Sequence, residues 1–359
     1  MGLGIALSNA LSGMRAGQNA VEIVSRNVAN SGVPGYHRQS LSVIDSNGLN
    51  STYVRTGVVT RAFNESLQFH HTRAVSDTGF SSVRASFVDR LQNVFGKPGT
   101  ANSLDTAFSS FQQSLSALST SPDSFAIRSE AVSKAQLLVG TLNDMSAQIQ
   151  SMRREAEGQI SNSVANLNQM LGTLEDLNVK ISDHGLNEST RAALADQRDR
   201  LVSGIASIVD VRADYRADGT VALMTRSGVG LLDGRASVFE FQSAGTLSAT
   251  SQFSVNTSQS GVGKLVLRTP AGLTLDLVQQ NVLKSGELAA LVELRDKTLV
   301  TAQDQLDEIA ASLAQAMSTV ETEGTATPSS ILPASGFDLD LASIRNGNHF
   351  VPNYEVNGH

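Results

Sequence analysis

Long stretches of the chain place apolar residues three or four positions apart, which is the spacing of an amphipathic helix with one buried face. They cover residues 3–28, 66–121, 130–182 and 286–320, and a segment rich in Gly, Pro and Asn breaks the second at 96–102. After a turn at 182–189, a shorter helix is expected up to residue 208. Helices should therefore make up most of the chain.

The first of these helices carries a seam with the regular spacing of a coiled coil. Its members are Leu3, Leu7, Ala10, Met14, Gly17, Val21, Val24 and Val28. They are separated by alternating steps of four and three residues over nearly four heptads. The seam is thin, because its side chains are mostly small or β-branched, and a lone helix of this kind is marginal in water. We expect it to face either the core of its own domain or another subunit.

The seam ends abruptly in the stretch RNVANSGVPGYHRQ, residues 26–39. Asn30 and Gly32 tolerate the left-handed backbone of a helix C-terminus, and Pro34 cannot continue a helix. Beyond it, apolar and polar residues partly alternate, and Asn47-Gly48 is a strong signal for a two-residue hairpin turn. We therefore expect a sharp corner followed by a β-hairpin.

The longest periodic stretch, residues 130–182, predicts a helix of up to roughly 80 Å. Near Gly158 three successive steps of four residues interrupt the alternation, which indicates local unwinding and a bend. Two ion pairs on the later helices are expected from their i,i+4 spacing. They join Asp196 to Arg200 and Glu293 to Lys297.

The character of the chain changes between residues 209 and 285. This region is rich in Ser, Thr, Gly and β-branched residues, with a period near two and turn signals at Asp218-Gly219 and Asp233-Gly234. The fold class is therefore expected to be mainly α with inserted β. An elongated coiled-coil or helical-bundle domain would carry a small all-β domain, in a multi-domain chain.

The same patterns suggest a division into four segments. Residues 1–65 would form an assembly helix and a β-hairpin, and 66–208 a long-helix bundle that 286–321 completes. The inserted β domain would span 209–285. Residues 322–359 resemble a linker and the start of a second β unit. Since this last pattern stops without a closing element, we expect the chain to be a fragment.

Composition narrows the class of protein. The 359 residues are enough for two or three domains of roughly 100–200 residues. A net charge of −7 without a basic run disfavours nucleic-acid binding. Cysteine is absent, so disulfides, zinc–thiolate sites and a Cys nucleophile are impossible, which suits a protein that travels unfolded. No apolar run of 18 residues and no cleavable signal sequence is present, so membrane insertion is not expected.

The motifs of catalysis and cofactor binding are missing. The histidines are His37, His70, His71, His184, His349 and His359. None has the HExxH spacing of a zinc site, and no GxSxG nucleophile motif occurs. GVGLLDG at 228–234 has one residue too many for a dinucleotide fingerprint, and GVGKL lacks the flanking residues of a P-loop. We expect no catalytic residue, cofactor or metal, and thus no enzyme.

The corner stretch resembles the N-terminal signature of the bacterial flagellar axial proteins, the rod, hook and hook-associated subunits. The matching residues are Asn27, Val28, Ala29, Asn30, Pro34, Gly35 and Tyr36. Val33 stands where Thr is usual, which removes a possible hydrogen bond and leaves the turn intact. Arg38 and Gln39 complete a Gly-Tyr-x-Arg-Gln run that is similar to the hook-associated branch.

Two later helices extend this resemblance to about residues 3–320. One contains Asp196, Gln197, Arg198 and Asp199, and the other Leu294, Arg295 and Asp296. Both look like segments of the hook-associated proteins that join hook to filament. In that family the N-terminal helix pairs with a C-terminal helix in an inner coiled-coil tube. Tyr36, Arg38 and Gln39 would lie at the corner and contact neighbouring subunits, or the cluster would only make a turn.

The resemblance implies a non-enzymatic structural subunit, exported unfolded through the flagellar type III apparatus and located outside the cell at the hook–filament junction. Its partners would be itself in a helical polymer, the hook subunit, a second junction protein, the flagellin side of the filament and an export chaperone. A hook or distal rod subunit is an alternative, but should lack the two later helices. A non-flagellar coiled-coil scaffold or surface adhesin is a further alternative.

Overall fold

The computed structural model describes residues 2–48, 51–101, 103–245, 247–256, 259–319, 325–327 and 336–338. By contacts between backbone positions the chain divides into two compact units, Met1–Leu306 and Asp307–His359. The first unit contains the corner motif, the long helices and the β insertion. The mainly α class with inserted β is confirmed.

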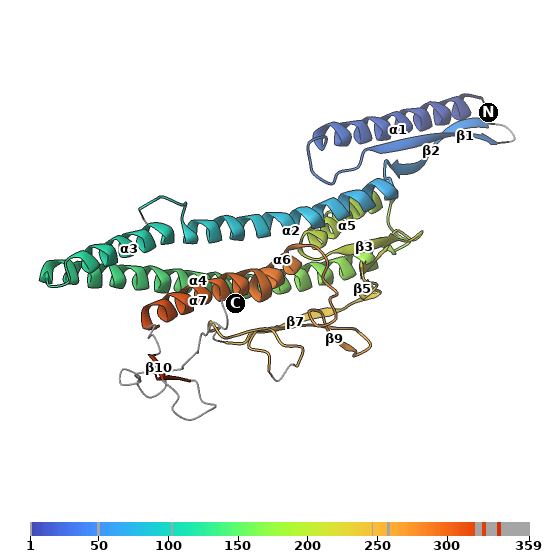
Figure 1. The fold of residues 1–359 in the computed structure, drawn as a ribbon. Helices are drawn as coiled ribbons and strands as arrows, with labels where there is room; N and C mark the ends of the chain where they lie inside the picture. Colours follow the sequence, from blue (N-terminus) through green and yellow to red (C-terminus); the bar gives the residue numbers. More distant parts are fainter. Residues whose placement is uncertain are drawn as a thin grey trace. The chain divides into compact units, whose positions relative to one another are not determined.

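The N-terminal part of the first unit is a helix that lies along a β-hairpin (Figure 1). Helix α1 spans Gly2–Ala29, and strands β1 (Gln39–Gly48) and β2 (Ser51–Arg61) pair antiparallel. The hairpin was expected, but the position of its turn was wrong. Asn47 and Gly48 are both paired with β2 inside the ladder, so continued strand pairing outweighs the local turn preference of this dipeptide.

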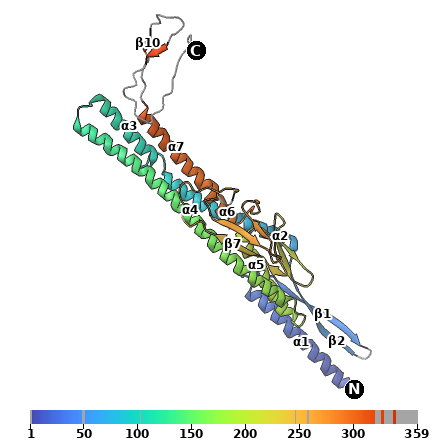
Figure 2. The same ribbon diagram turned by 90° about the horizontal axis from the view of Figure 1, so that it is seen from below.

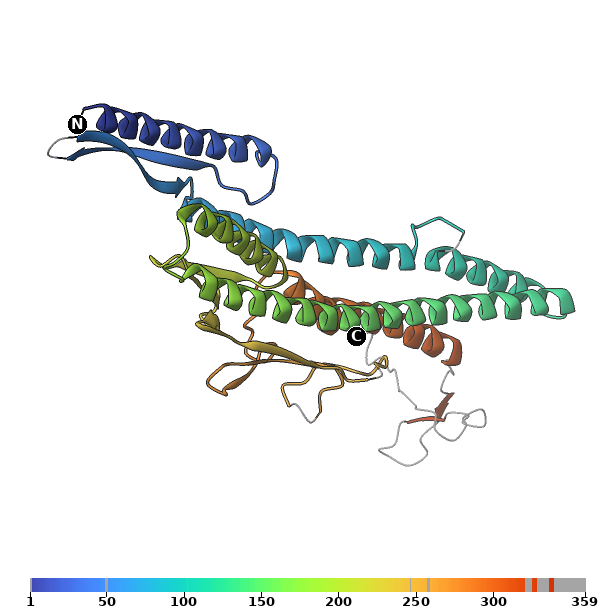
Figure 3. The ribbon, with the colours of Figure 1, turned by 180° about the vertical axis from the view of Figure 1, so that it is seen from behind.

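A bundle of four helices follows. Helix α2 spans Glu65–Phe95, α3 Leu104–Thr120, α4 Phe125–Ile181 and α5 Glu188–Ile208. Figures 2 and 3 show α3 beside the first part of α4 and α5 beside its last part. Side-chain oxygens of Asn64, Ser124 and Asn187 accept backbone N–H bonds at the starts of α2, α4 and α5, which is why these helices begin where they do.

Helix α4 is the element on which the bundle is built. It is continuous for 57 residues and runs without a break through Gly158, where a bend was expected. Its apolar row is buried over its length, as the spacing indicated. The buried members are Leu138, Leu142, Met145, Ile149, Met152, Ala156, Ile160, Val164, Leu167, Leu171 and Leu174. Packing along this row supports the helix across the stutter.

The β insertion begins with a four-stranded antiparallel sheet in the order β3-β4-β5-β6. The strands are β3 (Val211–Tyr215), β4 (Val221–Thr225), β5 (Gly230–Asp233) and β6 (Arg235–Ala236). Two of the connections were predicted. Gly219 and Gly234 lie in them with φ of 86° and 75°, a backbone region that favours glycine.

A three-stranded antiparallel sheet completes the insertion, in the order β7-β8-β9. Its strands are β7 (Val238–Gln242), β8 (Lys264–Arg268) and β9 (Thr274–Asp276). Strand β7 also lies against α4. The insertion is therefore packed on the bundle's central helix.

The chain then returns to helix. Helix α6 (Glu287–Glu293) leads through the π-helical turn η1 (Leu294–Thr298) into α7 (Leu299–Ser318). The expected pair of Glu293 with Lys297 is wrong, because Glu293 faces Arg84 of α2 with Nε–Oε1 at 3.5 Å. A π turn follows Glu293 directly and alters the i,i+4 spacing on which that expectation rested.

In the second unit, β10 (Thr325–Thr327) and β11 (Gly336–Asp338) pair antiparallel. They lie within 322–359, where a linker and a β unit were expected, and the rest of that segment lies outside the described residues. The division into four segments stays a prediction. Within the described residues, no helix is long and apolar enough to span a membrane.

Candidate functional site

The corner after α1 is closed by the side chain of Asn27. Its Oδ1 accepts hydrogen bonds from the Tyr36 hydroxyl at 2.7 Å and from the Gln39 N–H at 2.9 Å. Its Nδ2 donates to the Gln39 carbonyl at 2.8 Å. Asn30 closes the last turn of the helix itself, because its Nδ2 donates to the Arg26 carbonyl four residues earlier at 2.9 Å. These bonds give the motif its shape: the end of the helix and the start of the hairpin are tied to one side chain.

The corner packs against α5, and this requires a glycine at position 35. Gly35 has a φ of +75°, and a Cβ there would lie 2.5 Å from Cγ of Arg200. The Arg26 guanidinium donates to the Ser189 hydroxyl near the start of α5. The corner motif and helix α5, which contains Asp196 to Asp199, are distant in sequence but in direct contact.

An ion cluster forms the centre of this contact. Arg61, the last residue of β2, donates from Nη2 to Oδ1 of Asp196 and Oδ2 of Asp199, both at 2.6 Å. Nδ1 of His37 lies 3.1 Å from Oδ1 of Asp196, and Nε of Arg198 donates to Asp199 at 2.9 Å. The two aspartates and Arg198 are at most 4% exposed, so each buried carboxylate has a guanidinium partner.

These contacts correct the expected pair of Asp196 with Arg200. Asp196 instead binds a residue 135 positions earlier in the chain, while Arg200 covers the glycine of the corner. Tertiary packing places a charged partner closer to Asp196 than its own helix does. The spacing argument was wrong here because it considers one helix alone.

Aromatic rings surround the ion cluster. The Phe63 ring meets the rings of His37 and Tyr215 edge-on, with centroids 5.5 and 4.9 Å apart. The Arg198 guanidinium lies 4.7 Å from the centre of the Tyr215 ring. Burial raises the pKa of Tyr215, and burial followed by the charge of Asp196 raises that of Tyr36, so both phenols stay neutral at pH 7.

Three groups in the cluster could ligate a metal ion, since one donor atom each of His37, Asp196 and Asp199 lies within 4.8 Å of the others. The guanidinium of Arg61 already lies between these carboxylates. A divalent cation would have to displace this charge or be repelled by it. The arrangement is therefore an ion-pair cluster built around arginine.

The seam of α1 points away from the hairpin. Ala16 and Ile23 are the buried side chains of this helix. The six large seam residues are between 57% and 89% exposed, and Ala10 is exposed too. In the part of the chain that the structure describes, nothing covers this row. The large members are Leu3, Leu7, Met14, Val21, Val24 and Val28.

The residues Leu294, Arg295 and Asp296 make contacts inside the protein. Leu294 and Arg295 are buried, and Arg295 donates to both carboxylate oxygens of Asp296, at 2.7 and 2.9 Å. Its Nη1 donates to the carbonyl of Gly263 in the β insertion at 3.0 Å. This arginine therefore ties the π turn to the insertion.

A second buried arginine, Arg153 of α4, makes a parallel connection. It donates to the carbonyl oxygens of Ser248 at 3.0 Å, of Ser251, and of Arg295 at 3.3 Å. Burial lowers the pKa of Arg153. The guanidinium groups of Arg153 and Arg295 thus both donate hydrogen bonds to backbone carbonyls of the insertion.

The corner and α5 residues singled out in the sequence fall into two groups, those within the polar networks described above and those exposed to solvent. The structure brings Asn27, Tyr36 and Gln39 together in the corner and Asp196, Arg198 and Asp199 against it. Four others are exposed and take no part in these networks: Ala29, Pro34, Arg38 and Gln197. Sequence reasoning missed Arg61, Phe63, Tyr215 and Arg153. The only signal for Arg61 was its place across the hairpin from Gln39, and this depended on the strand register.

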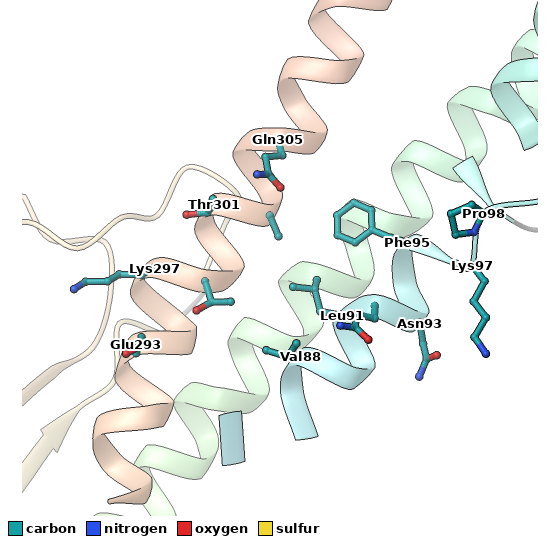
Figure 4. Close-up of a pocket in the computed structure, with 14 residues that line it drawn as sticks. Val88, Leu91, Asn93, Phe95, Lys97, Pro98, Glu293, Lys297, Thr301 and Gln305 are labelled. Atoms are coloured by element: carbon teal, nitrogen blue, oxygen red, sulfur yellow. The ribbon is translucent and has the colours of Figure 1, made fainter. Parts of the chain in front are cut away.

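A groove of about 880 Å³ lies between α2 and the segment from η1 into α7. Figure 4 shows Val88, Leu91 and Phe95 on the side of α2 that faces α7. Polar side chains form much of the remaining lining. Three of the lining residues are titratable: Lys97, Glu293 and Lys297.

Comparison with known proteins gives a consistent result. The family model for the flagellar hook-associated protein FlgK helical domain matches residues 88–330, and that for the flagella basal body rod protein matches residues 7–37. "Flagellar hook-associated protein 1" of Salmonella typhimurium is 24% identical over 329 residues, which are 89% of this chain and 56% of that protein. Its namesake in Bacillus subtilis is 25% identical over 235 residues, 62% of this chain and 46% of that protein.

A solved structure of the flagellar hook junction protein FlgK from Burkholderia pseudomallei has a TM-score of 0.56 at 21% identity. The match covers 70% of this chain and 43% of that one, and shows a common fold. This chain spans about half the length of the curated relatives it matches. Because the helical-domain model covers more than half of the chain, the chain belongs to the family of flagellar hook-associated proteins of the FlgK type.

Proposed function

We propose that this protein is a structural subunit of the bacterial flagellum that polymerises at the distal end of the hook and forms the hook–filament junction. Membership of the FlgK family supports this role. The observation that carries it is the exposed apolar seam of α1. A row of large apolar side chains at coiled-coil spacing favours association, because covering it with a second apolar surface removes that surface from water.

The corner motif fits the same role. It ends α1 within a few residues and turns the chain into the hairpin, so the seam is presented on a separate helix. In a polymer this would allow α1 to contribute to an inner layer. Tyr36 and Gln39 would hold the corner from inside, while the exposed side chain of Arg38 would be open to a neighbouring subunit.

The proposed partners are other copies of the chain, the hook subunit, a second junction protein and the flagellin side of the filament. Export through the flagellar type III apparatus, with a chaperone, is part of the proposal, and no catalysis is. The alternative of a hook or distal rod subunit is less supported, because the FlgK helical-domain model extends over residues 88–330. The scaffold or adhesin alternative does not account for the rod-protein match at 7–37.

The test is binding of the purified protein to isolated hooks, seen by electron microscopy with a gold-labelled antibody. We expect label at the distal end only. In a deletion strain, we expect hooks without filaments and flagellin shed into the medium. Label along the sides of hooks, or normal filaments in the deletion strain, would overturn the proposal.

A double variant tests the corner. Replacing Asn30→Ala and Pro34→Ala should leave the helix content of the monomer nearly unchanged, because Asn30 makes one side-chain bond and Pro34 is exposed. Assembly on hooks should fall. Normal motility of cells that carry both substitutions would show that the corner has no part in assembly.

A further inference from the structure

The arm, defined as α1 with the β1–β2 hairpin, is held to the bundle by a polar contact. We propose that Arg61, Asp196 and Asp199 form a latch that fixes the angle between the arm and α5. When the latch opens, the arm turns about residues 62–64 while arm and bundle both stay folded. This inference does not depend on the proposed function.

The first argument concerns what joins the arm to the bundle. Apart from the chain itself, the contacts given above are Arg26 with Ser189, the corner glycine under Arg200, and the ion cluster. The aromatic contact adds the ring of Phe63, which lies between His37 and Tyr215. The large apolar residues of α1 take no part in these contacts. A mostly polar contact between two folded parts of a chain permits relative motion, unlike a large hydrophobic one.

The second argument is geometric. Asp196 and Asp199 are three residues apart on α5, so both carboxylates lie on one face, and both are buried. The planar guanidinium of Arg61 reaches both at 2.6 Å from a single nitrogen. Arginine presents its donors in a rigid fork, so only a narrow range of arm orientations keeps both contacts. The cluster therefore restricts an angle.

The third argument is the charge balance. Two aspartates face two guanidinium groups, those of Arg61 and Arg198, and Nδ1 of His37 also lies beside Asp196. Removing Arg61 leaves two buried carboxylates with one remaining guanidinium. Opening the contact would hydrate them, since an unpaired buried charge is strongly unfavourable. Loss of Arg61 thus favours the open arm.

The test measures the angle through a distance. The chain has no cysteine, so Gln18→Cys on α1 and Ser161→Cys on α4, both at exposed positions, provide two unique sites for spin labels. Pulsed electron resonance then gives the distance distribution between arm and bundle. We expect one narrow peak in the parent protein, and loss of that peak to a broader second population in Arg61→Met. Arg90→Met, which breaks the exposed pair of Arg90 with Glu155, should leave the peak unchanged.

A second set of variants distinguishes a latch from a contact that only stabilises the fold. For a latch, neutralising an aspartate changes the width of the distance distribution in opposite directions with and without Arg61. Asp196→Asn should broaden the distribution in the parent, because it removes one partner of Arg61. In the Arg61→Met background the same substitution should narrow it, because it removes the unpaired carboxylate and leaves Asp199 paired with Arg198. If Arg61→Met does not fold, Arg61→Lys decides, with intermediate broadening expected. An unchanged peak in the folded Arg61 variants, or further broadening when Asp196 is neutralised in the Arg61→Met background, would overturn the proposal.

Discussion

Two substitutions on the seam test whether α1 is covered by another molecule. Leu7 is 72% exposed and Val24 is 59% exposed, and both belong to the coiled-coil row. Replacing both by Ala shortens the side chains and keeps or improves helix propensity. The perturbation therefore removes apolar surface that the monomer does not bury.

The size of the effect follows from these exposures. Full burial is worth about 0.8 kcal/mol per methylene, so Leu7→Ala, scaled by its exposed fraction, removes about 1.7 kcal/mol and Val24→Ala about 0.9 kcal/mol. If the polymer covers the seam completely, each subunit loses about 2.6 kcal/mol of association energy. This corresponds to a roughly 70-fold weaker contact.

The assay compares assembly with folding. We expect the protein concentration for half-saturation of isolated hooks to rise by roughly 70-fold, while the thermal unfolding midpoint of the monomer stays level or rises slightly. Val179→Ala with Leu273→Ala is the matched control, since these residues are 67% and 62% exposed but lie outside the seam. The control should alter neither quantity.

One combination of results would refute the reasoning. If hook binding is unchanged while the monomer becomes less stable, the seam is covered within its own chain. If the control pair weakens binding as much as the seam pair, general surface hydrophobicity would explain the effect.

Three further predictions concern stability. Gly79→Ala should destabilise by about 1–3 kcal/mol, because its Cβ would lie 2.4 Å from the Ser207 carbonyl oxygen, whereas Gly158→Ala, with nothing within 4 Å, should stabilise by up to about 1 kcal/mol; urea unfolding measures both, and equal signs would contradict the contact. Ile160→Ala, at a fully buried position, should cost about 2–5 kcal/mol without changing the slope of urea unfolding. Burial raises the pKa of Asp210, so its protonated form favours folding and the wild type should lose stability relative to Asp210→Asn as pH rises above about 4. Melting temperatures of the two proteins between pH 4 and 7 test this, and a constant difference would show that Asp210 does not titrate differently on folding.

The sequence was most informative where one row of residues had a single possible partner. The apolar row of α4 is long and regular, so the helix and its buried face could both be predicted. The turns at Gly219 and Gly234 were equally readable, because a positive φ restricts the choice of residue.

The seam of α1 shows where such reasoning stops. A row at coiled-coil spacing looks the same whether it packs on its own domain or on another copy. The face that does pack on the hairpin is carried by small or polar residues around Ala16 and Ile23, which give a weak hydrophobic signal. The pattern therefore predicted the helix but not the surface against which its seam packs.

Polar contacts between residues that are distant in the chain could not be predicted from the sequence. The partners of Asp196 come from the corner and from β2, and local spacing favours a neighbour on the same helix instead. The π turn at Leu294–Thr298 likewise had no local signal, and it undid the expected pair of Glu293 with Lys297. These features depend on the assembled fold.

The two buried arginines have a consequence for recombining parts of this protein. Arg153 and Arg295 sit inside the helices, yet several of their acceptors are main-chain oxygens of residues 248–263. A chimera that received this stretch from an unrelated donor would lose the acceptors of Arg153 at Ser248 and Ser251, and would leave Arg295 without its bond to Gly263, with Asp296 as its remaining partner. The two parts are therefore expected to be inherited as one block, and an engineer who wishes to exchange the loop should replace both arginines with neutral side chains in the same step.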